Sequence, residues 1–188
     1  MIDHFDVIAS IYDRFIGIQD HPHLKELLKL PTKGWVLDAA GGTGRVSFQL
    51  ASLTENLVVC DLSQKMLKKT KEKGSLIPVR SHVEKLPFPN ETFDRILVVD
   101  SFHHFCNQQE AAVDILRVLK PGGRIVIEEP DIQHFAVKLV AFAEKMLLMR
   151  SHFFKPNHIK NMFASFDVNV ALEHDGRFTS WIVVDKKI

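Results

Sequence analysis

The stretch that most constrains the fold of this chain runs from Trp35 to Arg45. An apolar run ends at Asp38, a turn of small residues from Ala39 to Gly44 follows, and a helical pattern begins at Val46. A strand, a tight turn and a helix in this order aim backbone N–H groups and a helix N-terminus at a ligand. Small residues suit the turn because a side chain would hold the ligand off the backbone, and because such turns often need positive φ.

Apolar segments and helical segments alternate along the chain. Residues 35–38, 57–61, 76–79, 93–99 and 124–128 have the pattern of short strands, with helical patterns between them. Several of these runs are continuously apolar, which is typical of a parallel sheet covered on both faces. Pro78 predicts an edge position for the third strand.

The C-terminal part follows a different pattern. Residues 166–173 and 178–185 are strand-like and are joined by a stretch that contains Asp-Gly, a hairpin signal. The predicted fold class is therefore α/β: a doubly wound, mostly parallel seven-stranded sheet with an antiparallel C-terminal hairpin. A length of 188 residues, 46% of them apolar, fits one domain over residues 1–188.

Composition excludes several classes of protein. The net charge of +1 gives no basic footprint for nucleic acid, and the lysines of residues 65–73 fit one solvated helix face. Cys60 and Cys106 cannot form a disulfide framework or a metal site by themselves, so no metal is expected. Acidic residues within the first 13 positions argue against a signal peptide, and no uncharged apolar stretch reaches about 18 residues. We expect a cytoplasmic protein with no membrane span.

The candidate ligand groups follow four consecutive strands. They are Asp38 with its turn, Asp61, residues 82–84 and residues 100–104. Ligands of open α/β sheets bind outside the carboxyl ends of the strands, so these groups predict one assembled site. The dinucleotide fingerprint fails because Ser47 holds its third glycine position, and the Walker pattern fails at Arg45. Asp61 has a spacing suited to an acid that binds ribose hydroxyls.

These motifs resemble those of the class I S-adenosylmethionine-dependent methyltransferases, and most of all the ubiquinone/menaquinone biosynthesis methyltransferase group. The matching stretches are Asp38–Gly44, Asp61–Leu67, Val83–Pro89, Phe93–Asp94, Phe102–Phe105 and Leu119–Gly123, with Phe5, Asp6, Ala9, Tyr12 and Asp13 near the N-terminus. The resemblance covers nearly the whole chain. It implies S-adenosylmethionine as cofactor, with S-adenosylhomocysteine as its product.

The resemblance also implies a set of cofactor-binding residues. They are Tyr12, Asp38, Ala40, Gly42, Gly44, Asp61, Leu62, Met66, His82, Val83, Asp100 and Ser101. The turn would admit the methionine part of the cofactor, and Asp38 would orient its ammonium, directly or through the turn. Asp61 would accept hydrogen bonds from the ribose hydroxyls, and Tyr12 would close over the site.

The other implied positions flank the adenine and the sulfonium. Leu62 and Met66 would pack on the adenine, the Val83 N–H would meet its edge, and Asp100 with Ser101 would lie near the sulfonium. His82 stands where the family usually has an acid. A neutral imidazole accepts a hydrogen bond through one nitrogen, so His82 is a candidate adenine contact, with a main-chain oxygen or water as the alternative.

Histidine is the candidate for acid–base chemistry. Methyl transfer needs a general base only where the acceptor must lose a proton, and histidine suits that role near neutral pH. Among ten histidines, His103 follows the fourth strand and is the preferred candidate, ahead of His134 and His152. The alternative is that His103 and His104 only pack and shape the cofactor pocket.

The segment from Phe135 to Met149 is the main clue to the acceptor. It is a strongly apolar helical pattern with three charged residues. Three interpretations stay open: a buried core helix, a wall of a hydrophobic acceptor pocket, or a homodimer interface. We expect residues 1–30 to form an N-terminal helical lid and residues 131–164 a helical acceptor-pocket insertion.

The resulting functional hypothesis is methyl transfer to a small, apolar or aromatic acceptor. The alternatives are a non-catalytic S-adenosylmethionine-binding or regulatory protein, and a methyltransferase that acts on a macromolecule. Amino-directed nucleic-acid methyltransferases usually carry Asn/Asp-Pro-Pro-aromatic after the fourth strand, whereas this chain has Asp100 to His103 in that place. That difference and the near-neutral charge count against nucleic acid as a partner.

Overall fold

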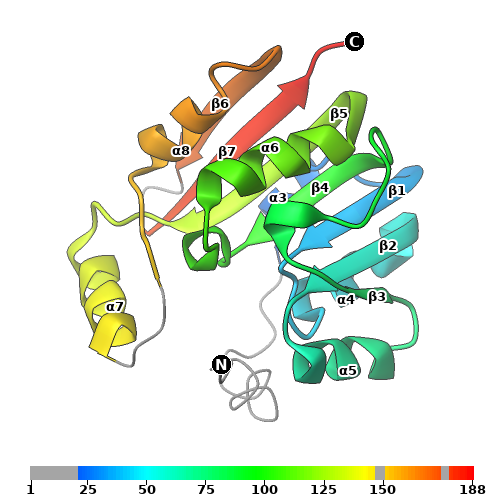
Figure 1. Ribbon diagram of the computed structural model, residues 1–188, viewed down its shortest axis with the longest axis horizontal. Coiled ribbons are helices and arrows are strands. Elements are labelled where there is room, and N and C mark those ends of the chain that lie inside the picture. The colour runs from blue at the N-terminus through cyan, green and yellow to red at the C-terminus, as the bar shows by residue number, and fades with distance from the viewer. Residues whose placement is uncertain (1–20, 147–150, 175–177) are drawn as a thin grey trace.

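A seven-stranded sheet forms the centre of the computed structural model, which describes residues 21–146, 151–174 and 178–188 (Figure 1). The strand order is β3-β2-β1-β4-β5-β7-β6. The strands are β1 (Thr32–Ala39), β2 (Thr54–Asp61), β3 (Ile77–Arg80), β4 (Phe93–Val99), β5 (Leu119–Pro130), β6 (Val168–His174) and β7 (Thr179–Lys186). The order reverses between β1 and β4, which makes their carboxyl ends the expected ligand site.

The predicted topology is confirmed. Strands β1 to β5 pair in parallel, and β7 runs antiparallel to both β5 and β6. Pro78 lies on β3 at the edge of the sheet, as its missing N–H requires. Strand β5 begins at Leu119 rather than at Arg124, because the Pro-Gly-Gly stretch is part of the strand rather than only a turn before it.

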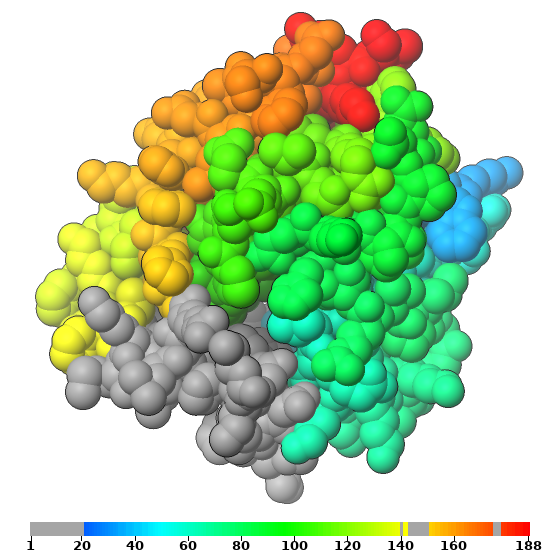
Figure 2. Space-filling model, viewed as in Figure 1, coloured from blue at the N-terminus to red at the C-terminus, as the bar shows by residue number. Residues whose placement is uncertain are grey.

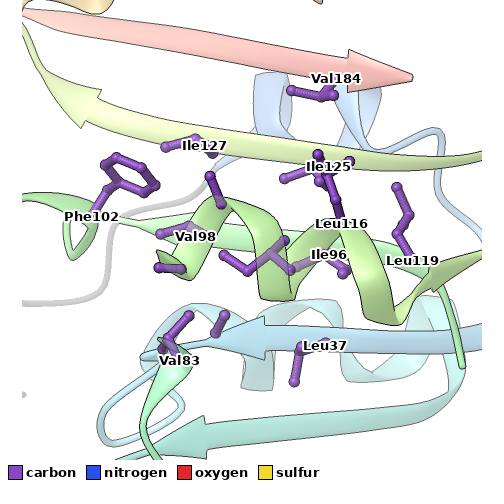
Figure 3. Close-up of a cluster of buried hydrophobic side chains, with 14 of the residues drawn as sticks. Leu37, Val83, Ile96, Val98, Phe102, Leu116, Leu119, Ile125, Ile127 and Val184 are labelled. Carbon is purple, nitrogen blue, oxygen red and sulfur yellow. The ribbon is translucent and has the colours of Figure 1, made fainter. Parts of the chain in front are cut away.

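Buried side chains alternate between the two faces of the sheet. Leu37 and Ile96 belong to a cluster that also contains Ile115 of α6 (Gln108–Val118), and Figure 3 shows part of that cluster. Val36 and Leu97 belong to the cluster on the other face. Because successive strand residues point to opposite faces, burial of both sets produces the continuous apolar runs seen in the sequence.

The helices cover both faces. They are α3 (Pro22–Leu27), α4 (Arg45–Leu50), α5 (Gln64–Glu72), α6, α7 (Phe135–Met146) and α8 (Pro156–Met162), with 3-10 turns η1 (Ala51–Leu53), η2 (Val83–Lys85) and η3 (Phe102–His104). Residues of α3, α4 and α5 join the second cluster, whereas α6 and α8 contribute to the first. Ser63 caps α5 as its residue type predicts, because its hydroxyl accepts the Met66 N–H at 3.2 Å.

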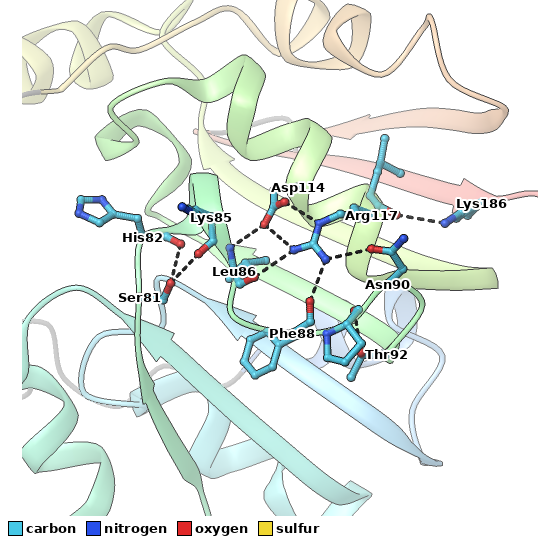
Figure 4. A network of polar contacts seen from close by, with 12 residues as sticks. Ser81, His82, Lys85, Leu86, Phe88, Asn90, Thr92, Asp114, Arg117 and Lys186 are labelled. Carbon is cyan, nitrogen blue, oxygen red and sulfur yellow. Dashed lines mark hydrogen bonds and ion pairs between the residues drawn. The ribbon is translucent and has the colours of Figure 1, made fainter.

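A polar network fixes the loop that follows η2 (Figure 4). The Arg117 guanidinium donates to the carbonyls of Leu86 and Phe88 at 3.0 and 2.8 Å and to the Asp114 carboxylate at 2.7 Å. Asp114 also accepts the Leu86 N–H at 2.6 Å. The loop is therefore tied to α6, and this tie holds η2 and its Val83 beside the carboxyl edge of the sheet.

Helix α7 is not a buried core helix. The side chains of Phe135, Leu139 and Phe142 are 75%, 55% and 64% exposed, and Val137 is buried. The helix projects from the sheet at the left of Figure 1, and in Figure 2 its yellow atoms adjoin the orange segment that precedes α8. Because these side chains are exposed, the interpretation of α7 as a buried core helix is wrong. Apolar composition alone cannot distinguish a helix that packs in a core from one that lines a pocket or an interface.

The predicted N-terminal lid is described only in its last part. Helix α3 packs on a face of the sheet, where Arg124 donates to the Leu27 carbonyl and Arg95 to the Leu28 carbonyl, both at 2.8 Å. The proposed lid residues 1–20, Tyr12 among them, lie outside the described residues, as does the end of the predicted helix at residues 147–149. None of the described helices is long and apolar enough to cross a membrane.

Candidate cofactor site

The turn after β1 has the backbone that small residues allow. Ala40, Gly42 and Gly44 have φ of 61°, 56° and 69°. A Cβ on Gly44 would lie 2.6 Å from the end of the Leu76 side chain and 3.2 Å from the Thr70 side chain, so these neighbours would have to shift to admit it. A Cβ on Gly42 would meet nothing within 4 Å. The open space therefore lies at Gly42, where a ligand can approach the backbone closely.

Helix α5 holds this turn from one side. The Thr70 hydroxyl donates to the Gly42 carbonyl at 2.8 Å, and the Lys73 ammonium donates to the Thr43 carbonyl at 2.7 Å. Sequence reasoning missed both contacts, since Lys73 belongs to a run of lysines that fits a solvated face. The turn is therefore held in place without a ligand.

Asp38 lies beneath the turn. It is 1% exposed, and the Ser47 hydroxyl of α4 donates to its carboxylate at 2.6 Å. Burial raises the pKa of Asp38 to about 7, and the Ser47 hydrogen bond opposes this rise. A Cβ on Gly41 would collide with the Asp38 carboxyl group. These contacts support a role in which Asp38 acts on a ligand through the turn.

Asp61 joins the end of β2 to the same turn. Its two carboxylate oxygens accept the N–H groups of Gly42 and Ser63 at 2.9 and 2.8 Å. An ionised carboxylate has about four lone-pair sites, which suits it to bind ribose hydroxyls as well as backbone N–H groups. Leu62 beside it is 41% exposed, whereas Met66 is only 1% exposed. Asp61 and Leu62 are therefore the more accessible members of this group.

The residues around η2 lie at the next strand end. His82 is exposed, and its Nδ1 lies 3.7 Å from a carboxylate oxygen of Glu84. Glu84 accepts the N–H groups of Cys106 and Asn107 at 2.8 and 3.2 Å, which ties η2 to the segment after β4. Val83 is buried. The contact of His82 with an adenine stays a prediction.

The end of β4 brings polar groups to the switch point from the side opposite the β1 turn. Asp100 has φ of 49°, and its N–H donates to the Glu128 carbonyl at 2.9 Å. Asp100 is an exposed residue. Desolvation of its carboxyl group, together with the charges of Glu129 and Glu128, raises the pKa of Asp100 to about 6. The Ser101 hydroxyl is buried and has no hydrogen-bond partner among the described residues.

His103 forms a buried pair that the sequence did not predict. Its Nδ1 lies 2.6 Å from a carboxylate oxygen of Glu129, and the two side chains are 5% and 4% exposed. Two neighbouring acids at a strand end, Glu128 and Glu129, were the only signal for this partner. Nδ1 of the neighbouring His104 forms a hydrogen bond with the Ser151 hydroxyl at 3.2 Å. Burial lowers the pKa of His104 to about 3.

These residues fit S-adenosylmethionine. Gly42 offers open space at the backbone, Asp61 offers acceptor capacity, and Ser101 offers a buried hydroxyl whose hydrogen-bonding capacity the described residues leave unused. All three lie at carboxyl ends of β1, β2 and β4, as predicted. Within the described part of the chain, no cluster of three or more His, Cys, Asp or Glu residues could hold a metal ion.

Comparisons with known proteins agree with this geometry. Residues 37–127 match a family model described as a methyltransferase domain. The chain is 33% identical over 127 residues to a ubiquinone/menaquinone biosynthesis C-methyltransferase of Stutzerimonas stutzeri, with 61% of this chain and 50% of that relative covered. The enzyme of the same name from Pseudomonas aeruginosa is 38% identical over 104 residues, with 50% and 41% covered. The chain thus spans half or less of the length of these two relatives.

Solved structures show the same fold. A methyltransferase described as putative, in complex with the Haloferax volcanii activator Trm112, superposes with a TM-score of 0.82 at 16% identity, with all of both chains covered. A complex of DhpI with S-adenosylhomocysteine superposes with a TM-score of 0.74 at 14% identity, with 98% of this chain and 94% of that chain covered. Residues 37–127 therefore match a methyltransferase domain, and the chain resembles the ubiquinone/menaquinone biosynthesis C-methyltransferases in sequence and these two proteins in fold.

Proposed function

We propose that this protein transfers the methyl group of S-adenosylmethionine to a small acceptor that is largely apolar or aromatic. The observation that carries the proposal is the assembly at one edge of the sheet of the Gly42 turn, the Asp61 carboxylate and the Ser101 hydroxyl. The cofactor supplies a methyl group made electrophilic by its sulfonium. The residues of the chain hold that group and the acceptor in line, which supplies much of the catalysis in such a displacement.

A pocket beside this edge supports the choice of acceptor. It has a volume of about 620 Å³, which lies in the range of small-molecule sites. It is lined by Ile132, Gln133, Lys138, Phe153, Phe154, Lys155 and His158. The Phe153 ring stacks on the His103 imidazole with centroids 4.1 Å apart, which connects the pocket to the end of β4. We infer that residues 131–164 form the acceptor-pocket insertion.

The proposal assigns roles to the predicted site residues. The turn of Ala40 to Gly44 would bind the methionine part of the cofactor, and Asp38 would hold the turn. Asp61 would bind the ribose, while residues 82–83 with Leu62 and Met66 would flank the adenine. Asp100 and Ser101 would lie near the sulfonium, and His103 would act as general base for an acceptor that must lose a proton.

Binding and turnover test the proposal in one design. We expect calorimetry to show that the protein binds S-adenosylmethionine and S-adenosylhomocysteine but not NAD. Incubation with methyl-labelled cofactor should then methylate members of a panel of hydroquinones, phenols and lipids. Hydroquinones come first because the relatives are named for ubiquinone and menaquinone biosynthesis. Methylation of polar amines alone would contradict the proposed acceptor, and binding without any turnover would favour a regulatory protein.

A glycine pair isolates the role of the turn. Gly42 and Gly74 both have positive φ, 56° and 75°, and a Cβ on either one would meet nothing within 4 Å. Gly42→Ala should weaken S-adenosylhomocysteine binding at least about tenfold, because the new methyl group fills the space in which the ligand approaches the backbone. Gly74→Ala carries similar left-handed strain, on the order of 1–2 kcal/mol, and should leave the affinity unchanged.

Calorimetry measures the affinity of each variant for S-adenosylhomocysteine, and thermal melting measures its stability. Both variants should lose thermal stability by a similar amount. Equal affinities for S-adenosylhomocysteine in the two variants would show that the space beside Gly42 is not used by the cofactor.

The homodimer and the cytoplasmic location stay predictions. Gel filtration with light scattering tests the homodimer.

A further inference from the structure

Both carboxylate oxygens of Glu129 contact groups of the turn after β4. One oxygen accepts the Phe102 N–H at 2.7 Å, and the other lies 2.6 Å from Nδ1 of His103. Glu129 is 3% exposed and His103 is 4% exposed, so water does not compete freely for these contacts. Since an ionised carboxylate only accepts hydrogen bonds, the proton of this contact belongs to His103 Nδ1. Glu129 thereby fixes one tautomer of the imidazole.

That tautomer leaves Nε2 as the nitrogen that can take up a proton. A neutral imidazole with its proton on Nδ1 has its lone pair on Nε2. The nearby carboxylate also stabilises the imidazolium that forms when Nε2 is protonated, as the orienting acid of a catalytic triad does. The pair therefore has the chemistry of a positioned general base.

The position of the imidazole agrees with this chemistry. His103 follows Ser101 by two residues, at the strand end that faces the switch point. One face of its ring stacks on Phe153, a lining residue of the acceptor pocket, at an interplanar angle of 15°. The His152 N–H donates to the His103 carbonyl at 2.7 Å, which fastens the insertion to the same turn. Phe153 thus connects the His103 imidazole, at the end of β4, to the acceptor pocket.

We propose that Glu129 is a positioning residue that holds His103 as the general base, and that the acceptor bears a proton on or next to its nucleophilic atom, as a phenol or hydroquinone does. This inference rests on the proposed methyl transfer. The acceptor gives its proton to Nε2 of His103, and its electron pair forms the bond to the methyl carbon. The bond from that carbon to sulfur breaks, and its electrons stay on the sulfur. His103 later releases the proton to solvent.

Other ionisable groups face this pair. Asp100 at the end of β4 adds negative charge near the pair, and the His104 ring lies beside that of His103 at an interplanar angle of 52°, with centroids 4.0 Å apart. Glu128 precedes Glu129 on β5, so its side chain points to the other face of the sheet. From the insertion, Ser151 and Phe153 contact the two histidines and bring no charge. A test must therefore separate the effect of Glu129 on the tautomer from a general change in charge.

Glu129→Gln makes that separation. Glutamine offers one acceptor oxygen where glutamate offers two, and the Phe102 N–H takes it. The amide NH₂ then faces Nδ1 of His103 and forces the proton to Nε2. Nitrogen-15 NMR of the histidine rings should show the Nδ1–H tautomer in the wild-type protein and the Nε2–H tautomer in E129Q. The control E128Q removes the charge of the preceding residue, which accepts the Trp181 ring N–H at 2.9 Å and lies 3.4 Å from Nδ1 of His21, and it should keep the wild-type tautomer.

The kinetics of E129Q distinguish a role of Glu129 in positioning His103 from a merely structural role. With 4-methylphenol, which stays protonated in mildly alkaline buffer, kcat of E129Q should fall at least about 100-fold. The acceptor KM and the affinity for S-adenosylhomocysteine should stay within about threefold of wild type. With 4-nitrophenol, which is already ionised in that buffer, the deficit of E129Q relative to wild type should shrink at least about tenfold, because no proton needs to be removed.

The outcomes separate this inference from the proposed function. If the wild-type protein methylates both phenols and E129Q shows the same deficit with each, the role of Glu129 is overturned and the methyl transfer stays intact. An Nδ1–H tautomer retained in E129Q would overturn it as well, whether or not a phenol is methylated. A wild-type protein that fails to bind S-adenosylhomocysteine would overturn the proposed function itself.

Discussion

Asp38→Asn should raise the stability of the protein at about pH 8 while weakening its binding of S-adenosylhomocysteine. Burial raises the pKa of Asp38 from 3.8 to about 7. Between these values the folded protein keeps a proton that the unfolded chain has lost, so the free energy of unfolding falls as the pH rises. Above pH 7 this loss reaches about 4 kcal/mol, since one pKa unit is worth about 1.4 kcal/mol. Asparagine stays neutral and can accept the Ser47 hydrogen bond.

Thermal melting over a pH series measures the effect. The melting temperature of Asp38→Asn should exceed that of wild type by roughly 10 °C at about pH 8, because 1 kcal/mol shifts a domain of this size by about 2–4 °C. The difference should shrink towards zero as the pH falls to the unfolded-chain pKa of 3.8, because below it Asp38 is protonated in both states. Asp167→Asn is the control, since its carboxylate is exposed beside Lys187 and should give no such pH dependence. If wild type and Asp38→Asn melted at the same temperature at high and at low pH, the raised pKa of Asp38 would be contradicted.

A gain in stability with a loss of binding would identify Asp38 as a residue kept for function. A buried carboxylate beneath a ligand turn is costly when ionised, and functional sites are where such costs are retained. In the proposed site a bound ammonium would favour the charged form of Asp38. Cofactor binding should then be accompanied by proton release from Asp38 near neutral pH, which calorimetry in buffers of different ionisation enthalpy detects.

Much of the fold could be predicted because local patterns and tertiary structure agree. Pro78 lacks an N–H and lies on an edge strand, and Ser63 caps α5, as their residue types require. The distinction between Gly42 and Gly44 could not be predicted. Both have positive φ, but only the structure shows that the Leu76 and Thr70 side chains pack against Gly44, whereas Gly42 faces open space.

The remaining differences concern contacts between segments that are far apart in the chain. Glu129 was missed because the sequence does not show that its carboxylate meets His103, 26 residues away. The exposure of α7 was open for a similar reason: an apolar helix has the same composition whether it packs on a sheet or borders a pocket. Local pattern therefore predicted which strand ends carry the candidate residues, whereas the contacts between those residues required the structure.

Asp61→Ala should weaken S-adenosylhomocysteine binding by about 2–3 kcal/mol, or about 30- to 150-fold. The carboxylate has two tasks in the proposed site. It would accept the ribose hydroxyls through charge-assisted hydrogen bonds, and it accepts the N–H groups of Gly42 and Ser63. Alanine removes both tasks together, so the turn loses its tie to β2 at the point where the ligand binds. Calorimetry measures the affinity directly.

Asp94→Ala is the matched control at the opposite end of the sheet. Its carboxylate likewise accepts a backbone N–H, that of Trp35 at 2.9 Å, and it pairs with Lys120 at 2.8 Å. Both variants should lose some thermal stability, because each leaves a backbone donor without its carboxylate. Only Asp61→Ala should lose cofactor affinity. If the two variants bound S-adenosylhomocysteine equally well, the ribose would not lie at Asp61, and the cofactor would have to enter the switch point in another orientation.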